Sequence, residues 1–527
     1  MTGVTDDALT NVQAALALPV GLVAEDRSID RRWLEHFRSQ IPAKIDRALE
    51  PFGYFETITS SRLENHKKNQ VRLLVEVKPG KPVRVATIRV AVIGPGEQHK
   101  ALQRQVEAFP LAVGDILRQD YYERAKGELV ATALDLGFLQ AEFVTHEIRV
   151  NRAQRRAEIE LVLSTGTQLR FGSVLLYGAP DYPEWFLKRH LAFAEGDVFS
   201  HAKLGQTQLN FLDSDRFRDV IISPREDLTQ NDKVPISMQL VPSVRRRLRP
   251  GLGYGTDTGA RFSLRYKDVN LLHRAHLFET DLLMAQWRQS LVSTYTMPSA
   301  RNLETQTAFR LGYKAEDVET YETRSIFAEA EQIWGFGKGR AGSVFLRLLQ
   351  EDYIVGQEDD RSRMVIPGIR FSRRRYKDPV RPQAGYSFSL EARGAHQHLA
   401  SDVSLLQLLA SGNTLVRLPA RFSVFVRTEG ATTLQNEPLA EVPASMRFFA
   451  GGDQSVRGYS YQSLGPKDDL GQTTGGKHLA VGSIELERKL WDNWGVACFY
   501  DVGNAFNSLS DIEWAQGAGI GVRYYTQ

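Results

Sequence analysis

The feature that most constrains this sequence is the loss of helical periodicity after residue 243. From Val244 onward, apolar and polar residues alternate in long runs, as in Phe422-Ser423-Val424-Phe425-Val426-Arg427. Fourteen strands are predicted, with first residues near 247, 259, 275, 290, 304, 321, 340, 363, 384, 402, 417, 481, 494 and 516. Many exceed the roughly 5–6 residues usual in soluble sheets and match the roughly 9–11 that cross a bilayer. The pattern predicts an antiparallel transmembrane β-barrel, with a soluble sandwich or propeller as the alternative.

The connections between these strands differ greatly in length. If the N-terminal domains lie on one side of the membrane, the link after the eighth strand returns to that side. It is short and contains Asp378-Pro379, Pro382 and Gly385, which is typical of a tight turn. The link after the eleventh strand lies on the far side and has about 50 residues. A loop of that length is usually either functional or disordered.

The first 243 residues mix helical and strand patterns in recurring units. Glycines that end a strand or mark a turn recur at offsets of 82 to 84 residues, namely Gly53 and Gly137, Gly94 and Gly178, and Gly114 and Gly196. Such self-similarity predicts repeated domains, which we place at 1–82, 83–166 and 167–243, with the barrel at 244–527. Each unit reads strand, helix, helix, strand, strand. The first unit lacks a clear opening strand, and its helix has an i, i+4 apolar stripe of Trp33, Phe37, Ile41, Ile45 and Leu49, capped by Asp30.

Composition excludes several classes of protein. Cys498 is the one cysteine, so neither an intramolecular disulfide nor a zinc–cysteine cluster is possible. The net charge of +3 gives no reason to expect a nucleic-acid partner. The apolar stretch from Ala14 to Ala24 lacks the basic flank of a signal peptide. Either the protein is cytoplasmic, or the sequence begins after its true start.

The long loop carries the most specific motif of the chain. It contains Arg447-Phe448-Phe449-Ala450-Gly451-Gly452-Asp453-Gln454-Ser455-Val456-Arg457-Gly458-Tyr459. This resembles the signature of the outer-membrane assembly barrels that carry polypeptide-transport-associated (POTRA) domains. Phe499-Tyr500-Asp501-Val502-Gly503 resembles the family's F.D.G strand, and the turn with Asp378-Pro379 resembles the turn before its Gly-Tyr strand. The resemblance implies α+β POTRA repeats (β-α-α-β-β) followed by a sixteen-stranded barrel. About fourteen of those strands are present, so we expect the first POTRA strand and the last two barrel strands to be missing.

The number of repeats narrows the resemblance within the family. Three resemble the TamA type, whereas the BamA type carries five and two-partner secretion transporters carry two. The implied protein is not an enzyme and has no cofactor or metal. It lies in the outer membrane of a Gram-negative bacterium, with its POTRA domains in the periplasm. There it helps insert or secrete β-barrel proteins such as autotransporters, with a TamB-like partner, unfolded outer-membrane substrates and outer-membrane lipid as its contacts.

The sequence is also compatible with three other classes of protein. A two-partner secretion transporter is the near alternative, and its POTRA count distinguishes it. A passive porin is a different class, but it needs neither soluble N-terminal domains nor the loop motif. A soluble enzyme with an all-β domain would need a cluster of titratable groups in a cleft, and the sequence offers none.

The resemblance also implies a loop–lumen anchor. In the family the loop arginine pairs with the aspartate of the F.D motif, which assigns Arg457 to Asp501, with Val456, Gly458 and Tyr459 around the pair. By strand alternation Asp501 shares a face with Phe499 and Gly503. The supporting motif comprises Arg447, Phe448, Phe449, Gly451, Gly452, Phe499 and Gly503.

The first barrel strand is the other site of interest. Gly251, Gly253 and Gly255 give it little side-chain packing, so it would pair weakly across a lateral seam that assists insertion. The equally good alternative is that these glycines only permit a tight bend. Two arginine triplets, 245–247 and 373–375, fall near the periplasmic rim. Solvated rim charge is the favoured interpretation for both, over contact with lipid head groups or substrate.

Overall fold

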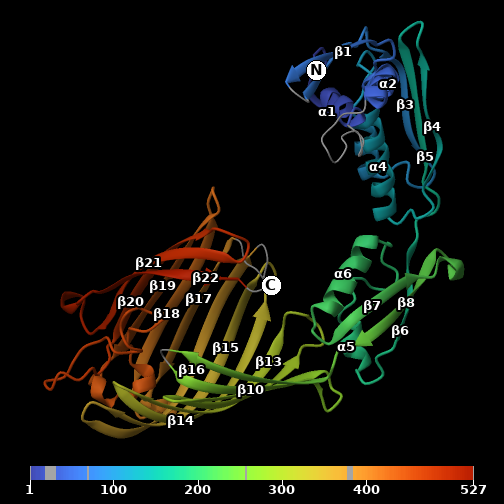
Figure 1. Cartoon of the computed structure of the whole chain (residues 1–527). Helices are drawn as coiled ribbons and strands as arrows, with labels where there is room; N and C mark the ends of the chain where they lie inside the picture. Colours follow the sequence, from blue (N-terminus) through green and yellow to red (C-terminus); the bar gives the residue numbers. More distant parts are fainter. Residues whose placement is uncertain (1, 18–30, 68–69, 256–257, 377–383, 526–527) are drawn as a thin grey trace. The chain divides into compact units, whose positions relative to one another are not determined.

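A computed structural model describes residues 2–17, 31–67, 70–255, 258–376 and 384–525. By contact density the chain forms two compact units. The first comprises residues 1–176, 192–209 and 221–239, and the second comprises residues 177–191, 210–220 and 240–527. Figure 1 labels most of their helices and strands.

The first repeat packs two helices on a β-hairpin. Its elements are α1 (Asp6–Ala15), α2 (Arg31–Leu49), the short 3₁₀ helix η1 (Glu50–Phe52), β1 (Ile58–Lys67) and β2 (Gln70–Lys78). The predicted stripe is confirmed at Phe37, Ile41, Ile45 and Leu49, which are buried in one cluster with Val75 and Val77. Asp30 and the Trp33 side chain lie outside the described residues. Thr2 bridges to Glu76 in parallel, so a strand-like pairing precedes the helices.

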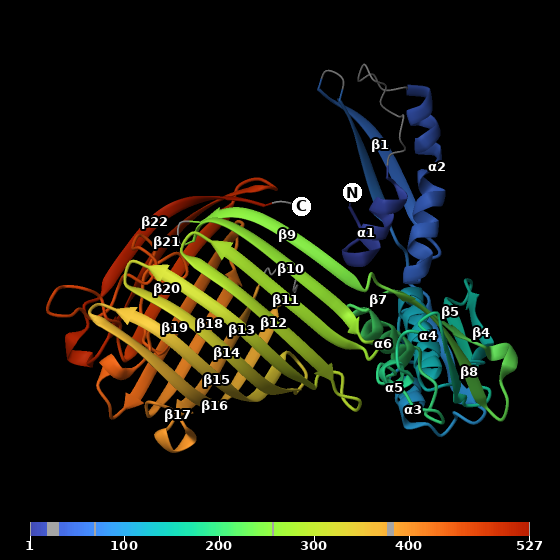
Figure 2. The same ribbon diagram turned by 90° about the horizontal axis from the view of Figure 1, so that it is seen from below.

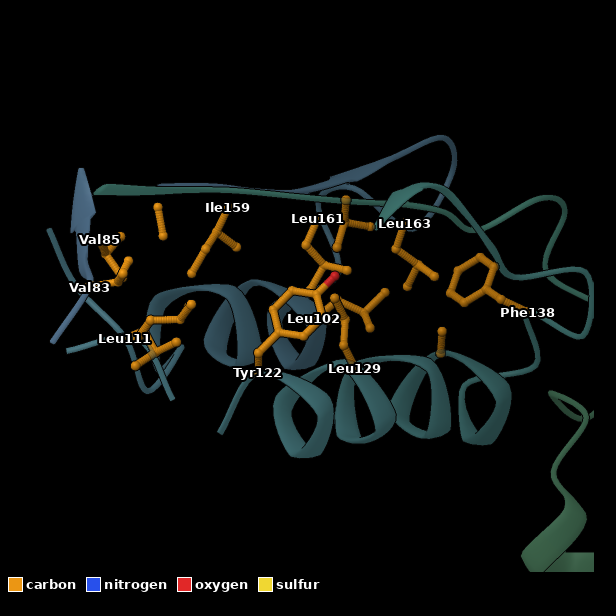
Figure 3. Close-up of a cluster of buried hydrophobic side chains, with 14 residues drawn as sticks. Val83, Val85, Leu102, Leu111, Tyr122, Leu129, Phe138, Ile159, Leu161 and Leu163 are labelled. Atoms are coloured by element: carbon orange, nitrogen blue, oxygen red, sulfur yellow. The ribbon is translucent and has the colours of Figure 1, made fainter. Parts of the chain in front are cut away.

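The second repeat has the predicted element order. It consists of β3 (Arg84–Ile93), α3 (Lys100–Glu107), α4 (Gln119–Asp135), β4 (Glu142–Asn151) and β5 (Arg156–Ser164). The sheet order is β3-β5-β4, with β3 parallel and β4 antiparallel to β5. Leu102, Tyr122 and Leu129 from the helices face Ile159 and Leu161 of β5 in a continuous core (Figure 3). The two helices therefore cover one face of a three-stranded sheet.

The third repeat has the same order of elements. It consists of β6 (Arg170–Tyr177), α5 (Glu184–Lys188), α6 (His201–Leu212), β7 (Phe217–Pro224), the 3₁₀ turn η2 (Glu226–Leu228) and β8 (Lys233–Pro242). Its sheet order is β6-β8-β7. In the second repeat, Gly137 adopts a left-handed backbone conformation (φ +85°) at the turn after α4. The turn after α6 in the third repeat has no glycine, and Asp215 adopts the left-handed conformation instead (φ +59°).

The remaining strands form one antiparallel sheet of fourteen strands in the part of the chain that is described, in the order β22 to β9. The strands are β9 (Arg246–Gly255), β10 (Gly259–Leu271), β11 (His276–Ala285), β12 (Arg288–Pro298), β13 (Gln306–Val318), β14 (Tyr321–Gly335), β15 (Arg340–Val355), β16 (Glu358–Tyr376), β17 (Gly385–Ala395), β18 (Leu405–Arg417), β19 (Phe422–Gln435), β20 (His478–Lys489), β21 (Trp494–Phe506) and β22 (Ala515–Tyr524). Every predicted strand start lies within five residues of the observed one. The sheet curls into the wall of a barrel, with each strand beside its neighbour in sequence (Figure 2).

The two faces of this wall differ in polarity. One face carries exposed Leu346, Ile369, Leu390 and Leu408, while buried Glu331 and other charged groups line the opposite face. This apolar-out, polar-in alternation is that of a membrane barrel. The connection between β16 and β17, with Asp378, Pro379 and Pro382, lies outside the described residues. No helix among the described residues has the length and hydropathy to span a membrane.

Candidate functional site: the loop anchored in the barrel lumen

The chain between β19 and β20, residues 436–477, folds against the inner face of the wall. Phe448, Ala450 and Val456 of this loop are buried in one apolar cluster with Leu479 and Val481 of β20. Two short 3₁₀ turns, η4 (Leu439–Glu441) and η5 (Ala444–Met446), precede that cluster. The loop is therefore packed against the wall over much of its length.

Arg457 binds two strands of the wall at once. Its Nε and Nη2 donate to the two carboxylate oxygens of Asp501 at 2.7 and 2.8 Å. Its Nη1 donates to Glu485 at 2.8 Å, and its Nη2 also donates to the Ser483 hydroxyl at 3.1 Å. Bidentate pairing of this kind fixes orientation as well as charge. The structure thus brings together Arg457 and Asp501, and adds Glu485 and Ser483 from β20.

Asp501 is fully buried and all its contacts favour the charged form. Besides the guanidinium, it accepts the Arg457 backbone N–H at 3.0 Å and the Ser483 hydroxyl at 2.6 Å. Glu485 also accepts a hydrogen bond from Arg523 of β22. Two arginines therefore balance two carboxylates. A buried charge needs this compensation because desolvation is costly.

Aromatic and backbone contacts complete the anchor. The Arg457 guanidinium carbon lies 3.5 Å from the centre of the Phe499 ring, a cation–π contact with the strand that holds Asp501. Tyr459 is partly exposed, and its hydroxyl reaches the Gln516 carbonyl of β22 at 3.4 Å. Gly458 has φ +94°, which favours glycine at the turn after the arginine.

Close backbone approach explains further glycines around the loop. A Cβ on Gly451 would lie 2.5 Å from the Ser460 carbonyl oxygen, and one on Gly503 would lie 2.7 Å from that of Ala480. Gly452 has φ +98°. Gly517 of β22 was not expected at the site, yet a Cβ there would lie 2.2 Å from the Arg457 carbonyl oxygen.

Arg447 forms a second anchor. Its side chain is completely buried and donates to the carbonyls of Val442 at 2.7 Å, Ala440 at 2.8 Å and Thr474 at 3.1 Å, and also to the Glu358 carboxylate. Phe448 exchanges backbone hydrogen bonds with Gly476 at 2.9 and 2.8 Å, and the Phe449 ring lies 5.1 Å from that of Tyr321. Arg447 thus closes the loop on itself and ties it to β16.

A third contact reaches the opposite part of the wall. Arg288 of β12 donates to the Tyr461 hydroxyl at 2.6 Å, and Thr320 donates to the Gln462 carbonyl at 3.2 Å. The loop is therefore held by strands from β12 to β22, so it crosses the lumen.

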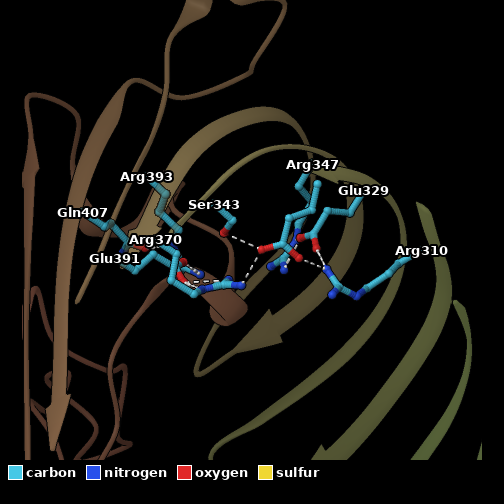
Figure 4. Close-up of polar contacts among 9 residues, drawn as sticks. Arg310, Glu329, Ser343, Arg347, Arg370, Glu391, Arg393 and Gln407 are labelled. Atoms are coloured by element: carbon cyan, nitrogen blue, oxygen red, sulfur yellow. Dashed lines mark hydrogen bonds and ion pairs between the residues drawn. The ribbon is translucent and has the colours of Figure 1, made fainter. Parts of the chain in front are cut away.

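A separate ionic network lines the wall (Figure 4). Glu329 and Glu331 of β14 are almost completely buried between arginines of the neighbouring strands. Its members are Arg310, Glu329, Glu331, Ser343, Arg347, Arg370, Glu391, Arg393 and Gln407. Glu391 pairs with Arg370 at 2.7 Å, and Arg393 donates to Gln407 at 2.9 Å.

The seam glycines lie in β9, which pairs with β10 along its length. In register, Gly251 lies opposite Ser263 and Gly253 opposite Arg261. A Cβ on Gly251 would lie 2.6 Å from the Ser263 hydroxyl, and one on Gly253 would lie 2.9 Å from Arg261 Nε. Gly255 faces Gly259 at the end of the ladder. These glycines therefore leave room for side chains of β10.

Two segments of the chain match models of known protein families. Residues 270–526 match the Omp85 superfamily domain. Residues 270–526 are therefore an Omp85 superfamily domain. Residues 1–79 match the first POTRA domain of TamA. With these domains, the Omp85 barrel lies in the outer membrane and its POTRA domains lie in the periplasm.

Relatives of this Omp85 protein are distant in sequence. This chain is 20% identical over 488 residues to the outer membrane protein assembly factor BamA of Nitratidesulfovibrio vulgaris. The alignment covers 88% of this chain and 60% of that protein. The chain thus spans about 60% of that relative's length.

Solved structures share the fold. The crystal structure of BamA from Haemophilus ducreyi lacking POTRA domains 1–3 is similar with a TM-score of 0.70 at 14% identity, over 84% of this chain and 94% of that chain. The likeness to CdiB from Acinetobacter baumannii has a TM-score of 0.47 at 15% identity, over 84% of each chain, and is too low to support a conclusion.

Proposed function

We propose that this chain is a TamA-type assembly factor, which helps to insert or secrete outer-membrane β-barrel proteins such as autotransporters. The observation that carries the proposal is the match of residues 1–79 to the first POTRA domain of TamA, followed by two further repeats of the same element order before the barrel. The similarity to a BamA assembly factor supports the broader role in outer-membrane protein assembly.

In this proposal the domains divide at residues 82/83, 166/167 and 243/244. The periplasmic POTRA domains receive unfolded substrate and a TamB-like partner. Strand addition at a sheet edge is a general way to capture extended chains, and β4 and β7 are edge strands of their sheets. Outer-membrane lipid surrounds the barrel.

The lateral seam is the second part of the proposal. β9 lies at one edge of the described sheet, and its Leu252 side chain is 88% exposed, against 49% for Leu390 on β17. A strand flanked on both sides covers its side chains better. Weak packing by Gly251, Gly253 and Gly255 would help β9 exchange its partner for an incoming strand.

The anchored loop gives the lumen a different character from that of a passive pore. Because Arg457, Arg447 and Tyr461 hold the loop across the lumen, free diffusion of solutes would require their release. This supports an assembly role over a porin role. Through Asp501 and Glu485, the anchor holds the loop against β20 and β21.

The experiment that tests the function uses cells that lack the gene. Surface delivery of an autotransporter, release of a two-partner exoprotein and uptake of a small antibiotic are measured with and without the restored gene, and with a variant lacking residues 1–79. The proposal predicts that cells without the gene lose autotransporter delivery and neither of the other two activities. It also predicts that the TamB-like partner co-purifies with the intact protein but not with the variant lacking residues 1–79. Loss of exoprotein release alone would instead assign a secretion transporter, and loss of antibiotic uptake alone a porin.

A further inference from the structure

The two arginine triplets of the sequence differ in their surroundings. Arg245 and Arg246 both bind the buried Asp268 carboxylate, at 3.0 and 3.3 Å, and Arg247 binds Asp215 at 2.7 Å. These three arginines therefore have protein partners. The triplet Arg373–Arg375, in contrast, forms no ion pair with any residue that the structure describes.

The second triplet contributes to a basic group on the outer face of the wall. By strand alternation Arg373 and Arg375 share the face of Ile369 and Phe371, which points to lipid. Arg340, the first residue of β15, lies directly opposite Arg373 in the ladder and on the same face. Its guanidinium donates to the carbonyls of Phe336 at 3.1 Å and Gly337 at 3.3 Å, and to no carboxylate among the described residues.

Like charges placed opposite each other in a ladder repel. Arg373 contacts the Tyr386 ring at 5.5 Å, yet its Nε is buried with no hydrogen-bond partner in the described part of the chain. Arginines crowded in this way at the edge of a hydrocarbon region would be stabilised by an anion. The guanidinium fork suits a phosphate because it can offer two parallel donors.

The position of the group along the barrel identifies the leaflet. β9 follows the periplasmic domains, so odd-numbered strands begin and even-numbered strands end at the periplasmic edge. Arg340 begins β15, and Arg373 and Arg375 lie near the end of β16. Trp334 and Phe336, both exposed, lie at the same edge, as aromatic side chains do at membrane interfaces.

An apolar hollow adjoins the arginines on the lipid face. It has a volume of about 580 Å³ and is lined by Ile369, Phe371, Leu390, Leu408, Ala410 and Gly430 of β16 to β19, which lie side by side (Figure 2). Phe371 is two residues from Arg373, about 7 Å along the strand. Ala410 and Gly430 lie opposite each other in the β18–β19 ladder and add little side-chain bulk to the hollow. A charged end and an apolar end together fit an amphipathic ligand.

We propose that Arg340, Arg373, Arg375 and this hollow bind one phospholipid of the periplasmic leaflet. The arginines bind its phosphate, and the hollow holds one of its acyl chains. The site shares no residue with the luminal loop or the seam. The lipid site and the assembly function can therefore be tested separately.

The test uses the full chain purified in detergent, with phosphatidylglycerol added and retention measured by native mass spectrometry. The double variant Arg373→Gln/Arg375→Gln removes two phosphate donors. Its matched control is Arg361→Gln/Arg363→Gln, on the same strand and face but at the opposite end. Gly430→Leu fills the hollow without changing charge, and a Cβ there meets only the Leu479 carbonyl at 3.8 Å. Unchanged circular dichroism shows that each variant is folded.

We expect the Arg373/Arg375 variant to bind phosphatidylglycerol at least about tenfold more weakly, which is about 1.4 kcal/mol. The Gly430→Leu variant is also expected to bind more weakly, and the control is expected to match the parent. Equal loss in the control would mean diffuse attraction and would overturn the site. Displacement of the lipid by inorganic phosphate alone would show an anion site without lipid specificity and would also overturn it. The proposal would also be overturned if the Arg373→Gln/Arg375→Gln variant kept the lipid but lost binding of an unfolded outer-membrane polypeptide.

Discussion

Replacing Arg457 by alanine is expected to release the luminal loop while leaving the barrel folded. The side chain makes four hydrogen bonds, to Asp501 twice, Glu485 and Ser483, and all are lost. Asp501 keeps only the backbone N–H of residue 457 and the Ser483 hydroxyl, and Glu485 keeps Arg523.

The size of the effect follows from what remains buried. Breaking a buried ion pair from one side costs about 3–5 kcal/mol. Because the Arg457 side chain is 21% exposed and both acids keep other partners, the low end of about 3 kcal/mol applies. At about 1.4 kcal/mol for each factor of ten, the population of the released loop should rise about a hundredfold.

Hydrogen exchange measured on the purified protein reports this population locally. The amides to follow are those of Ala450 and Leu464, which exchange hydrogen bonds at 2.9 Å, and that of Gly452, which donates to Tyr459 at 3.1 Å. The ladder of β13 to β16 serves as the internal reference. Arg427→Gln is the matched control, because Arg427 contacts the loop at the Ser455 carbonyl, at 3.0 Å, and at the Gln454 side chain, at 3.4 Å, and donates no hydrogen bond to Asp501 in the described part of the chain. The reasoning fails if loop amides exchange no faster in Arg457→Ala than in Arg427→Gln.

Further variants test other parts of the structure. Gly517→Ala should speed exchange of the same loop amides without any change in charge, since its Cβ would lie 2.2 Å from the Arg457 carbonyl oxygen; parent-like exchange would contradict this. Asp268→Asn leaves Arg245 and Arg246 without their carboxylate, and because both arginines are partly exposed it should cost no more than about 3 kcal/mol, the low end for a buried pair. Faster proteolysis near residues 240–248 would detect this loss, whereas Asp281→Asn on the exposed surface should leave proteolysis unchanged. Burial lowers the pKa of His190 in the third repeat to about 4 from an ordinary 6.5. Between about pH 4 and pH 6.5, His190 is therefore protonated in the unfolded chain and neutral in the folded repeat. This contribution to stability is complete above pH 6.5 and falls by up to about 3 kcal/mol as the pH drops to 4. Exchange of α5 and α6 amides should show the fall, and His190→Phe should lack it.

Strand positions were predictable because a barrel imposes a period of two along every strand. The largest errors have local causes. β16 begins at Glu358 rather than near 363, because the charged run Asp359–Arg361 continues the ladder beyond the apolar band, where Arg361 pairs with Asp352. β19 begins at Phe422 rather than near 417, because the turn before it places Ala420 and Arg421 in the left-handed region without a glycine to mark it.

The site was only partly predictable. The resemblance predicts Arg457 and Asp501, but neither Glu485 nor Ser483 was predicted from the sequence. The signal was present, since Ser483 and Glu485 are two residues apart and lie opposite Asp501 and Phe499 in the β20–β21 register. Gly517 could not have been found this way, because its role depends on how closely the loop backbone approaches β22. The partners of the two arginine triplets also depend on tertiary placement.

The contact between Glu485 and Arg457 changes how the anchor must be tested. A charge swap between Arg457 and Asp501 would be the natural test for an isolated pair. In this structure it would place a carboxylate at 457 beside Glu485, which now binds the guanidinium at 2.8 Å. The new repulsion would prevent rescue even though the native contact is direct, so failure of the swap cannot refute it. Adding Glu485→Gln to the swap removes that repulsion, which makes the triple variant the informative one.

The two polar systems of the lumen meet at one residue. Gln407 is fully buried, accepts from Arg393 of the wall network at 2.9 Å and donates to the Met446 carbonyl of the loop at 2.7 Å. All other interactions of the wall network shown in Figure 4 stay within the strands. The loop can therefore leave the lumen by breaking its own contacts with the strands, of which, among the described residues, only this hydrogen bond involves the wall network of Figure 4, while the arginine–glutamate pairs of β13 to β17 continue to hold the wall. Such an arrangement separates the stability of the barrel from the position of its loop.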